Sequence, residues 1–380
     1  MFPYGRQSID DEDVAAVIET LRSDFLTTGP KIEEFEAQLC DKTGAPYAVV
    51  CGNGTLALHL SALALNIGDG DAVIVPSLTF LATANAIRYC GGSVVFSDVD
   101  PDTGLMRVQD FQEALEHAEK KNMTVKAVYP VHMTGQCANL KEIKNLADQH
   151  GIAVVVDGSH SLGAEYYGEP VGKSRDALMM TYSFHPVKTI AMGEGGAITT
   201  HDKNLADKMR ILRSHGIEKR LDIGPWFYEM KDLGFNYRIT DIQCALGISQ
   251  IKKLDKFVTR RRELASLYDE LLKPLFPRIK PPKRENYTVS SWHLYAPRFD
   301  FKALRINRAD LMNELSKKDI GTQVHYIPVH SQPYYKNLYG DICLPGTEEY
   351  YEGTLSLPFY PALKNEDVEY VSNTLKEILL

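Results

Sequence analysis

Short apolar runs alternate with longer amphipathic stretches between Tyr47 and about Thr200. Seven runs predict strands because they are short, rich in β-branched residues and bounded by turn-forming residues. In chain order they are YAVVC, DAVIVP, SVVFSDV, VKAVYPVH, IAVVVD, ALMMTYSF and GAITT. Apolar strands with helices between them are typical of a mostly parallel sheet buried on both faces. Because ligands of such sheets bind beyond the carboxyl ends of the strands, we expect function to reside there.

The pattern changes after the segment GFNYR, which ends at Arg238. A long helix that continues past the basic segment TRRR is predicted by apolar residues at helical spacing, namely Ile248, Ile251, Leu254 and Val258. Further on we expect a strand at SWHLYAPRF, a helix at RADLMNELSKK, a strand around GTQVHYIP and a closing helix from Asn365. The chain therefore divides into a large domain over 1–240, which includes an N-terminal arm, and a smaller α+β domain over 241–380.

Composition and charge narrow the class of partner. The 380 residues are 44% hydrophobic and 24% charged, values close to those of globular proteins. The net charge of -8 is spread along the chain, which disfavours nucleic acid as a partner. Six scattered cysteines without a CxxC pair indicate free thiols and no zinc site. The N-terminus does not resemble a signal peptide and no apolar run is long enough for a membrane span, so we expect a cytoplasmic protein that acts on a small molecule.

The first predicted strand is followed by Gly52-Asn53-Gly54-Thr55, which opens the helical stretch LALHLSALAL. Free backbone N–H groups and the helix dipole favour an anion such as phosphate at this position. The segment matches neither GxGxxG nor a Walker motif. A Gly-Asn turn before a helix is also common without any ligand, so this signal alone leaves both interpretations open.

Three other strands end in residues that suit a planar cofactor. Phe80 follows the second strand and could stack on a flat ring, although phenylalanine is more often a core residue. Asp157 ends the fifth strand, where a buried carboxylate needs a cation or hydrogen-bond donors, or else caps a turn. Ser183 and Lys188 follow the sixth strand, and a lysine among apolar residues can form a Schiff base. An anion cradle, a stacking ring, an acid and a lysine together are the groups that hold pyridoxal phosphate.

The chain resembles the DegT/DnrJ/EryC1/StrS aminotransferases over nearly its whole length. The matching segments are PYGRQSIDDEDVAAVIETLRSDFLTTGP, PSLTFLATANAI, VVDGSHSLGAEY, SFHPVKTIAMGEGGAITT, RSHGIEK, GFNYRITDIQCALGISQIKKL and QVHYIPVHSQPYY. Members of this family are fold-type I enzymes that use pyridoxal phosphate to aminate nucleotide-linked keto sugars. The resemblance implies a large α/β domain with a mostly parallel seven-stranded sheet, a smaller α+β domain, and a homodimer with shared active sites.

The resemblance also implies roles for particular residues. Lys188 would bond covalently to pyridoxal phosphate, Asp157 would keep its pyridine nitrogen protonated, and Phe80 would stack on its ring. His160 would lie near the phenolic oxygen of the ring, where many relatives have glutamine. The cofactor phosphate would be held by Gly54, Thr55 and Ser183, and by Asn236 of the partner subunit.

Candidates for contacts with the substrate are Tyr4, Thr27, His185, His325, Tyr326 and His330. For His325, Tyr326 and His330 the alternative is a polar strand face of the small domain. Family members in which histidine replaces the lysine are dehydratases, so Lys188 favours transamination.

Within the family, HYIPVHSQPYY and the segment that carries Lys188 are most similar to enzymes of pseudaminic acid biosynthesis. These enzymes transfer the amino group of L-glutamate to C4 of UDP-2-acetamido-2,6-dideoxy-β-L-arabino-hexos-4-ulose, giving UDP-4-amino-4,6-dideoxy-N-acetyl-β-L-altrosamine. Enzymes for GDP-linked (perosamine-type) or dTDP-linked 4-keto-6-deoxy sugars share the same core motifs and stay as alternatives. A non-catalytic regulator is disfavoured by the retention of Lys188, Asp157 and Ser183. A Rossmann-type or glycosyl-transfer protein is disfavoured because no glycine fingerprint follows the first strand.

Overall fold

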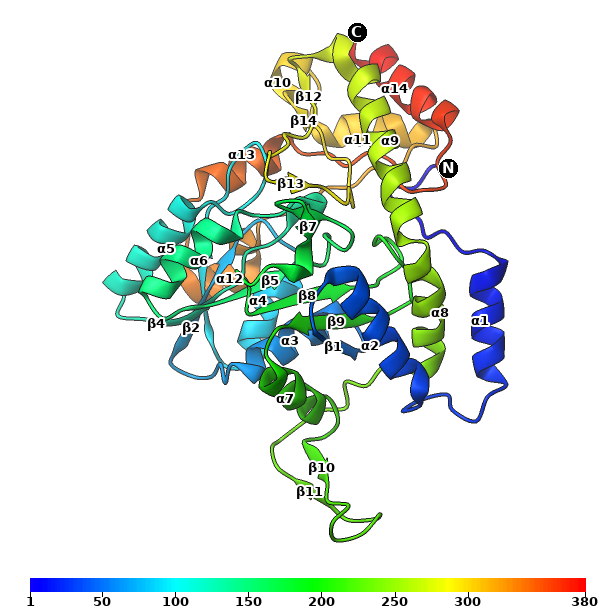
Figure 1. Cartoon of the computed structure of the whole chain (residues 1–380). Helices are drawn as coiled ribbons and strands as arrows, with labels where there is room; N and C mark the ends of the chain where they lie inside the picture. The colour runs from blue at the N-terminus through cyan, green and yellow to red at the C-terminus, as the bar shows by residue number, and fades with distance from the viewer.

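The computed structural model describes residues 1–380, and its large domain is built on a seven-stranded sheet (Figure 1). The order of strands across the sheet is β1-β9-β8-β5-β4-β2-β3, and only β9 runs antiparallel to its neighbours. The seven predicted strands are all confirmed: β1 (Tyr47–Cys51), β2 (Asp71–Pro76), β3 (Ser93–Ser97), β4 (Thr124–Val128), β5 (Ala153–Asp157), β8 (Met179–Ser183) and β9 (Gly196–Thr200).

Helices cover both faces of this sheet. One face packs against α2 (Pro30–Thr43), α5 (Val108–Lys120), α6 (Leu140–Gln149) and α8 (Asp241–Lys252). The other face packs against α3 (Gly54–Ala64), α4 (Leu81–Tyr89) and α7 (Lys203–Arg213). Successive strand residues alternate between the two cores, since Val154 and Val156 belong to one and Val155 to the other. Burial on both faces is the reason that the strands are continuous apolar runs.

A third hydrophobic core lies in the C-terminal part of the chain. Its helices are the second half of α9 (Leu254–Leu272), α10 (Phe301–Leu304), α11 (Arg308–Lys317) and α14 (Asn365–Leu379). The predicted helices at α11 and α14 are confirmed, whereas the expected long helix is divided into α8 and α9, which meet at Lys253. The division of the chain at residue 240 stays a prediction. None of the helices has both the length and the apolar character needed to span a membrane.

Other elements pack beside the large domain or project from it. α1 (Asp11–Leu21) lies beside α8, and α12 (Pro333–Tyr339) and α13 (Pro345–Gly353) pack back onto the large domain. A small sheet contains β6 (Glu165–Tyr166), β7 (Glu169–Pro170) and β13 (Thr288–Val289). A hairpin of β10 (Ile217–Lys219) and β11 (Tyr228–Met230) projects from the body of the molecule in Figure 1.

Of two strands expected in the small domain, one is much shorter than predicted and the other is absent. SWHLYAPRF is a strand only at β14 (Arg298–Phe299), which pairs with β12 (Ile279–Lys280). Its first residues instead hydrogen-bond to a loop of the large domain, since the His293 N–H donates to the Thr134 carbonyl. GTQVHYIP forms a single bridge, between Gln323 and Ser356. Both segments run along the junction of the two domains, where loops rather than neighbouring strands satisfy their backbone groups.

Candidate functional site

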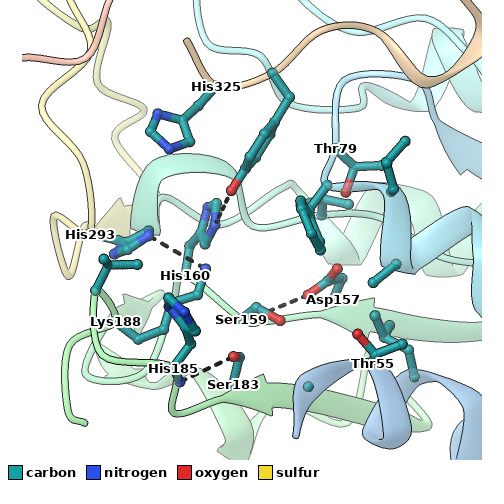
Figure 2. A pocket seen from close by; sticks show the side chains of 18 of the residues that line it. Thr55, Thr79, Asp157, Ser159, His160, Ser183, His185, Lys188, His293 and His325 are labelled. Atoms are coloured by element: carbon teal, nitrogen blue, oxygen red, sulfur yellow. Dashed lines mark hydrogen bonds between the residues drawn. The ribbon is translucent and has the colours of Figure 1, made fainter. Parts of the chain in front are cut away.

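A cavity of about 600 Å³ lies at the carboxyl ends of the parallel strands (Figure 2). The large domain supplies most of its lining, and His293 with the segment 323–327 supplies the wall on the side of the small domain. Most of the predicted site residues line it, namely Tyr4, Gly54, Thr55, Phe80, Asp157, His160, Ser183, His185, Lys188, His325 and Tyr326. The structure therefore brings these side chains together, and their individual roles stay predictions.

Three predicted residues do not line this cavity. His330 is buried, and its Nδ1 lies 2.6 Å from the Ser77 hydroxyl, which also accepts its backbone N–H at 3.0 Å. That imidazole therefore links the small domain to the loop after β2. Thr27 and Asn236 lie on the surface, in backbone bridges with Thr240 and Ser214 respectively. The role of Asn236 toward a partner subunit stays a prediction.

The start of α3 lies beside Ser183 and forms a cradle of backbone N–H groups. Asn53 caps the helix by accepting the Leu56 N–H at 3.0 Å, while the N–H groups of the first turn have no partner within the helix. A Cβ on Gly54 would lie 2.8 Å from the Ser183 Cβ, so only glycine allows this approach. Backbone N–H groups and a serine hydroxyl therefore converge on one place, a donor set that suits a phosphate.

Asp157 is held by two hydrogen-bond donors at the end of β5. Its Oδ2 accepts from the Thr83 hydroxyl at 2.7 Å and its Oδ1 accepts from the Ser159 N–H at 3.0 Å. Thr83 is oriented in turn by Thr79, whose hydroxyl lies 2.8 Å away. These donors fix the direction of the carboxylate, whose side chain is buried. A positively charged heterocycle in the cavity would meet an acid that is already oriented.

Lys188 lies on the loop after β8 and extends into the cavity (Figure 2). Burial lowers the pKa of its amine to about 8, against the opposing effect of the Asp157 charge. Its Nζ lies 3.5 Å from Nε2 of His293. Since the amine has a much larger neutral fraction near neutral pH than an ordinary lysine, it is suited to attack a carbonyl group.

Neutral imidazoles form the wall opposite the cradle. Burial lowers the pKa of His160 well below its ordinary value, and the charges of Lys188 and His325 add to this effect. Burial and Lys188 likewise lower the pKa of His325 to about 3. His160 accepts the Thr134 N–H at Nδ1, 3.3 Å away, so its proton is on Nε2, 3.2 Å from the Tyr326 hydroxyl. Tyr326 can then direct its own O–H toward a ligand.

Several lining or supporting residues were not predicted from the sequence. Ser159 follows Asp157 by two residues, which is the spacing of an Asx turn. Thr83 lies one helical turn after Phe80, so both had a local signal. His293 is 105 residues from Lys188 in the chain, and no local pattern connects the two.

The sequence is similar to known proteins along nearly its whole length. The model of the DegT/DnrJ/EryC1/StrS aminotransferase family matches residues 7–376. A UDP-4-amino-4,6-dideoxy-N-acetyl-beta-L-altrosamine transaminase from Campylobacter jejuni is 39% identical over 383 residues, which cover 100% of this chain and 98% of that protein.

The fold is also similar to solved structures of aminotransferases over nearly the whole chain. Helicobacter pylori PseC, an aminotransferase involved in the biosynthesis of pseudoaminic acid, has a TM-score of 0.91 and 32% identity, covering 100% of this chain and 99% of its own. The PLP-form of the putative sugar aminotransferase Spr1654 from Streptococcus pneumoniae has a TM-score of 0.90 and 29% identity, covering 99% and 98%. The architecture is therefore that of the fold-type I aminotransferases. The chain belongs to the DegT/DnrJ/EryC1/StrS aminotransferase family.

Proposed function

We propose that the protein is a pyridoxal-phosphate-dependent aminotransferase that moves the amino group of L-glutamate to C4 of UDP-2-acetamido-2,6-dideoxy-β-L-arabino-hexos-4-ulose. The product would be UDP-4-amino-4,6-dideoxy-N-acetyl-β-L-altrosamine, a precursor of pseudaminic acid. The observation that carries the chemistry is one cavity that holds both Lys188, whose pKa is lowered to about 8, and a buried, hydrogen-bonded Asp157. The similarity to the Campylobacter transaminase and to PseC supports the choice of sugar.

The residues of the cavity fit pyridoxal phosphate. The first turn of α3 and the Ser183 hydroxyl would hold its phosphate, Phe80 would cover a face of its ring, and Asp157 would hold a proton on its pyridine nitrogen. Once bound to Lys188, the cofactor would supply a conjugated ring that takes up the electron pair left when a proton leaves Cα of the amino acid.

The protein's own residues would manage the proton transfers. With Nζ released from the cofactor, Lys188 would take the proton from Cα of the amino acid and hold it until it is delivered to C4′ of the cofactor. Asp157 is oriented by its two donors, so its carboxylate would face the pyridine nitrogen and retain a proton there. Because one cavity serves glutamate and the keto sugar in turn, we expect ping-pong kinetics.

We also propose that two copies of the chain share their active sites. Large apolar side chains are exposed along the projecting hairpin, including Leu221, Trp226, Met230 and Leu233. Others are exposed on and after α1, including Val14, Ile18, Leu21 and Phe25. Apolar surface of this extent is typical of a protein interface. The segment that carries Asn236 begins next to the hairpin, so a partner seated there would meet it.

The test is the visible spectrum of the protein loaded with pyridoxal phosphate. L-glutamate should remove the absorbance of the lysine-bound cofactor, and the UDP-linked keto sugar should restore it. Loss without restoration would support an aminotransferase whose substrate is a GDP- or dTDP-linked 4-keto sugar instead. A protein that binds the cofactor but does not respond to glutamate would be a non-catalytic regulator. The Lys188→Ala variant is the matched control: it should lack the absorbance of the lysine-bound cofactor, and glutamate should not convert its cofactor to the amine form.

A further inference from the structure

His293 is the buried group nearest to Lys188 that the proposed chemistry leaves unused. Its ring is 2% exposed and lines the cavity, with Nε2 3.5 Å from the Lys188 Nζ. Its Nδ1 is buried and has no hydrogen-bond partner. The His160 ring packs against it, with the two ring centroids 4.3 Å apart, but the only hydrogen-bond partner of the His293 imidazole within the protein is the amine of Lys188 (Figure 2).

The backbone of His293 is fixed from both sides. Its N–H donates to the Thr134 carbonyl at 2.9 Å, and its carbonyl accepts from Nη1 of Arg261 at 3.1 Å. Arg261 is 1% exposed, and its guanidinium is directed at three carbonyls, those of Trp292, His293 and Phe359. Burying a guanidinium without a carboxylate is costly. These three hydrogen bonds join the segment that carries His293 to α9 and to the loop at Phe359.

The backbone around His293 is also strained. Thr134 has φ of +58° and Trp292 has φ of +53°, a region that residues with a side chain rarely adopt. The turn at Thr134 orients two histidines, because its carbonyl accepts from His293 and its N–H donates to Nδ1 of His160. Strain of this kind persists only where surrounding contacts maintain it, and it is often found at functional sites.

We propose that His293 is a positioning residue for Lys188, an inference that rests on the proposed function of that lysine. Its neutral imidazole accepts a hydrogen bond at Nε2 from the protonated Nζ. This contact keeps the amine at the cavity wall while it holds the proton between the two transfers. It also raises the affinity of Nζ for that proton, which burial alone would weaken. A contact of 3.5 Å is suited to tighten when substrate fills the cavity.

The test measures the pKa of Lys188 in the full-length, cofactor-free protein. The rate at which fluorodinitrobenzene modifies Lys188 is followed against pH, and the modified peptide is identified by mass. In His293→Leu the acceptor is lost, so we expect the pKa to fall by about one unit or more, because hydrogen bonds to charged groups are strong. In His293→Gln an amide oxygen replaces Nε2, and the pKa should stay within about half a unit of the parent value.

Two further variants separate positioning from packing. His293→Asn keeps a polar side chain that is too short to reach Nζ, so it should lower the pKa as His293→Leu does, even if the leucine variant fails to fold. His132→Leu changes another buried histidine whose Nε2 has no partner, and it should leave the Lys188 pKa unchanged. An unchanged or raised pKa in both His293→Leu and His293→Asn would overturn the proposal, as would an equal fall in His132→Leu.

The pKa measurement does not depend on the reaction. The other titratable residues that line the cavity are Tyr4, Asp157, His160, His185, Glu194, His325 and Tyr326, and all are unchanged in these variants. If pyridoxal phosphate failed to bond to Lys188, the proposed function would fail, whereas the contact between Lys188 and His293 would still be measured. The two failures are therefore distinguishable.

Discussion

The charge of Asp157 acts on Lys188. Burial lowers the pKa of the lysine amine, and the carboxylate partly opposes this effect. In Asp157→Asn the amide can keep both hydrogen bonds, to Thr83 and Ser159, while the negative charge is lost. We expect the pKa of Lys188 in the cofactor-free protein to fall below 8 by roughly half a unit or more. The pH dependence of Lys188 modification measures this change.

The pKa of Lys188 also determines how uptake of the cofactor depends on pH. Neutral Nζ forms as pH rises through about 8 in the parent protein, so uptake of pyridoxal phosphate by the cofactor-free protein should accelerate over that range. In Asp157→Asn the acceleration should move to lower pH. Asp202→Asn, a change at the N-cap of α7, is the matched control. If Asp157→Asn left the midpoint in place, the carboxylate would have no electrostatic role toward the lysine.

Gly54 tests the anion cradle sterically. The Cβ of an alanine would lie 2.8 Å from the Ser183 Cβ, so Gly54→Ala must displace either the start of α3 or the strand end that carries Ser183. We expect the Kd for pyridoxal phosphate to rise roughly tenfold or more, because the phosphate donors would lose their alignment. Fluorescence or absorbance titration of the cofactor-free protein measures this constant.

Gly68→Ala provides the comparison for Gly54→Ala. The nearest atom to a Cβ at Gly68 is the Cys90 carbonyl oxygen, 4.0 Å away, and Gly68 does not line the cavity. The Kd of the Gly68→Ala variant for pyridoxal phosphate should therefore equal that of the parent protein. Equal constants for the two variants would show that the close approach of Gly54 to Ser183 does not matter for cofactor binding.

The locations of individual site residues were predictable where a residue follows a strand. Asp157 ends β5, while Gly54, Phe80 and Lys188 lie beyond strand ends, and all four converge on one edge of the sheet. His293 was not predictable, because its contact with Lys188 depends on how the small domain docks. Glu194 also lines the cavity, but a polar residue in a loop carries no signal until the loop is folded.

At the scale of elements, strands buried on both faces were easier to predict than segments at the domain junction. β5 alternates between two apolar cores, so its sequence is apolar throughout. In the segments 291–299 and 321–328, by contrast, His293 and His325 are buried and line the cavity. His325, for example, donates to or accepts from the Ser356 hydroxyl at 2.8 Å. The strands expected in these two segments are therefore replaced by irregular chain that forms a wall of the site.

The β10–β11 hairpin is the element on which the proposed homodimer depends. Replacing Trp226 and Met230, which are 74% and 66% exposed, by serine removes apolar surface without disturbing a core. We expect the double variant to shift from dimer to monomer at micromolar concentration, as measured by light scattering after size exclusion. Leu338→Ser, an exposed apolar residue on α12, should leave the parent state unchanged. A double variant with the mass of the parent would exclude the hairpin from the interface.

At the scale of the whole molecule, the site is built where three bodies meet. The sheet edge supplies the cradle, the acid and the lysine, while Tyr4 from the N-terminal arm and residues 323–327 from the small domain close the cavity. The arm is held in place by the small domain, because the Phe359 N–H donates to the Tyr4 carbonyl at 3.0 Å. Any movement between the two domains would therefore change access to Lys188.

The most direct test of the central proposal is to identify the residue that bonds to the cofactor. The protein loaded with pyridoxal phosphate is reduced with borohydride, digested and examined by mass spectrometry. We expect one pyridoxyl phosphate group on the peptide that contains Lys188, and none after L-glutamate is added before the reduction. A protein with no such group, or one that carries it on another lysine, would contradict the assignment of Lys188 and the aminotransferase mechanism built on it.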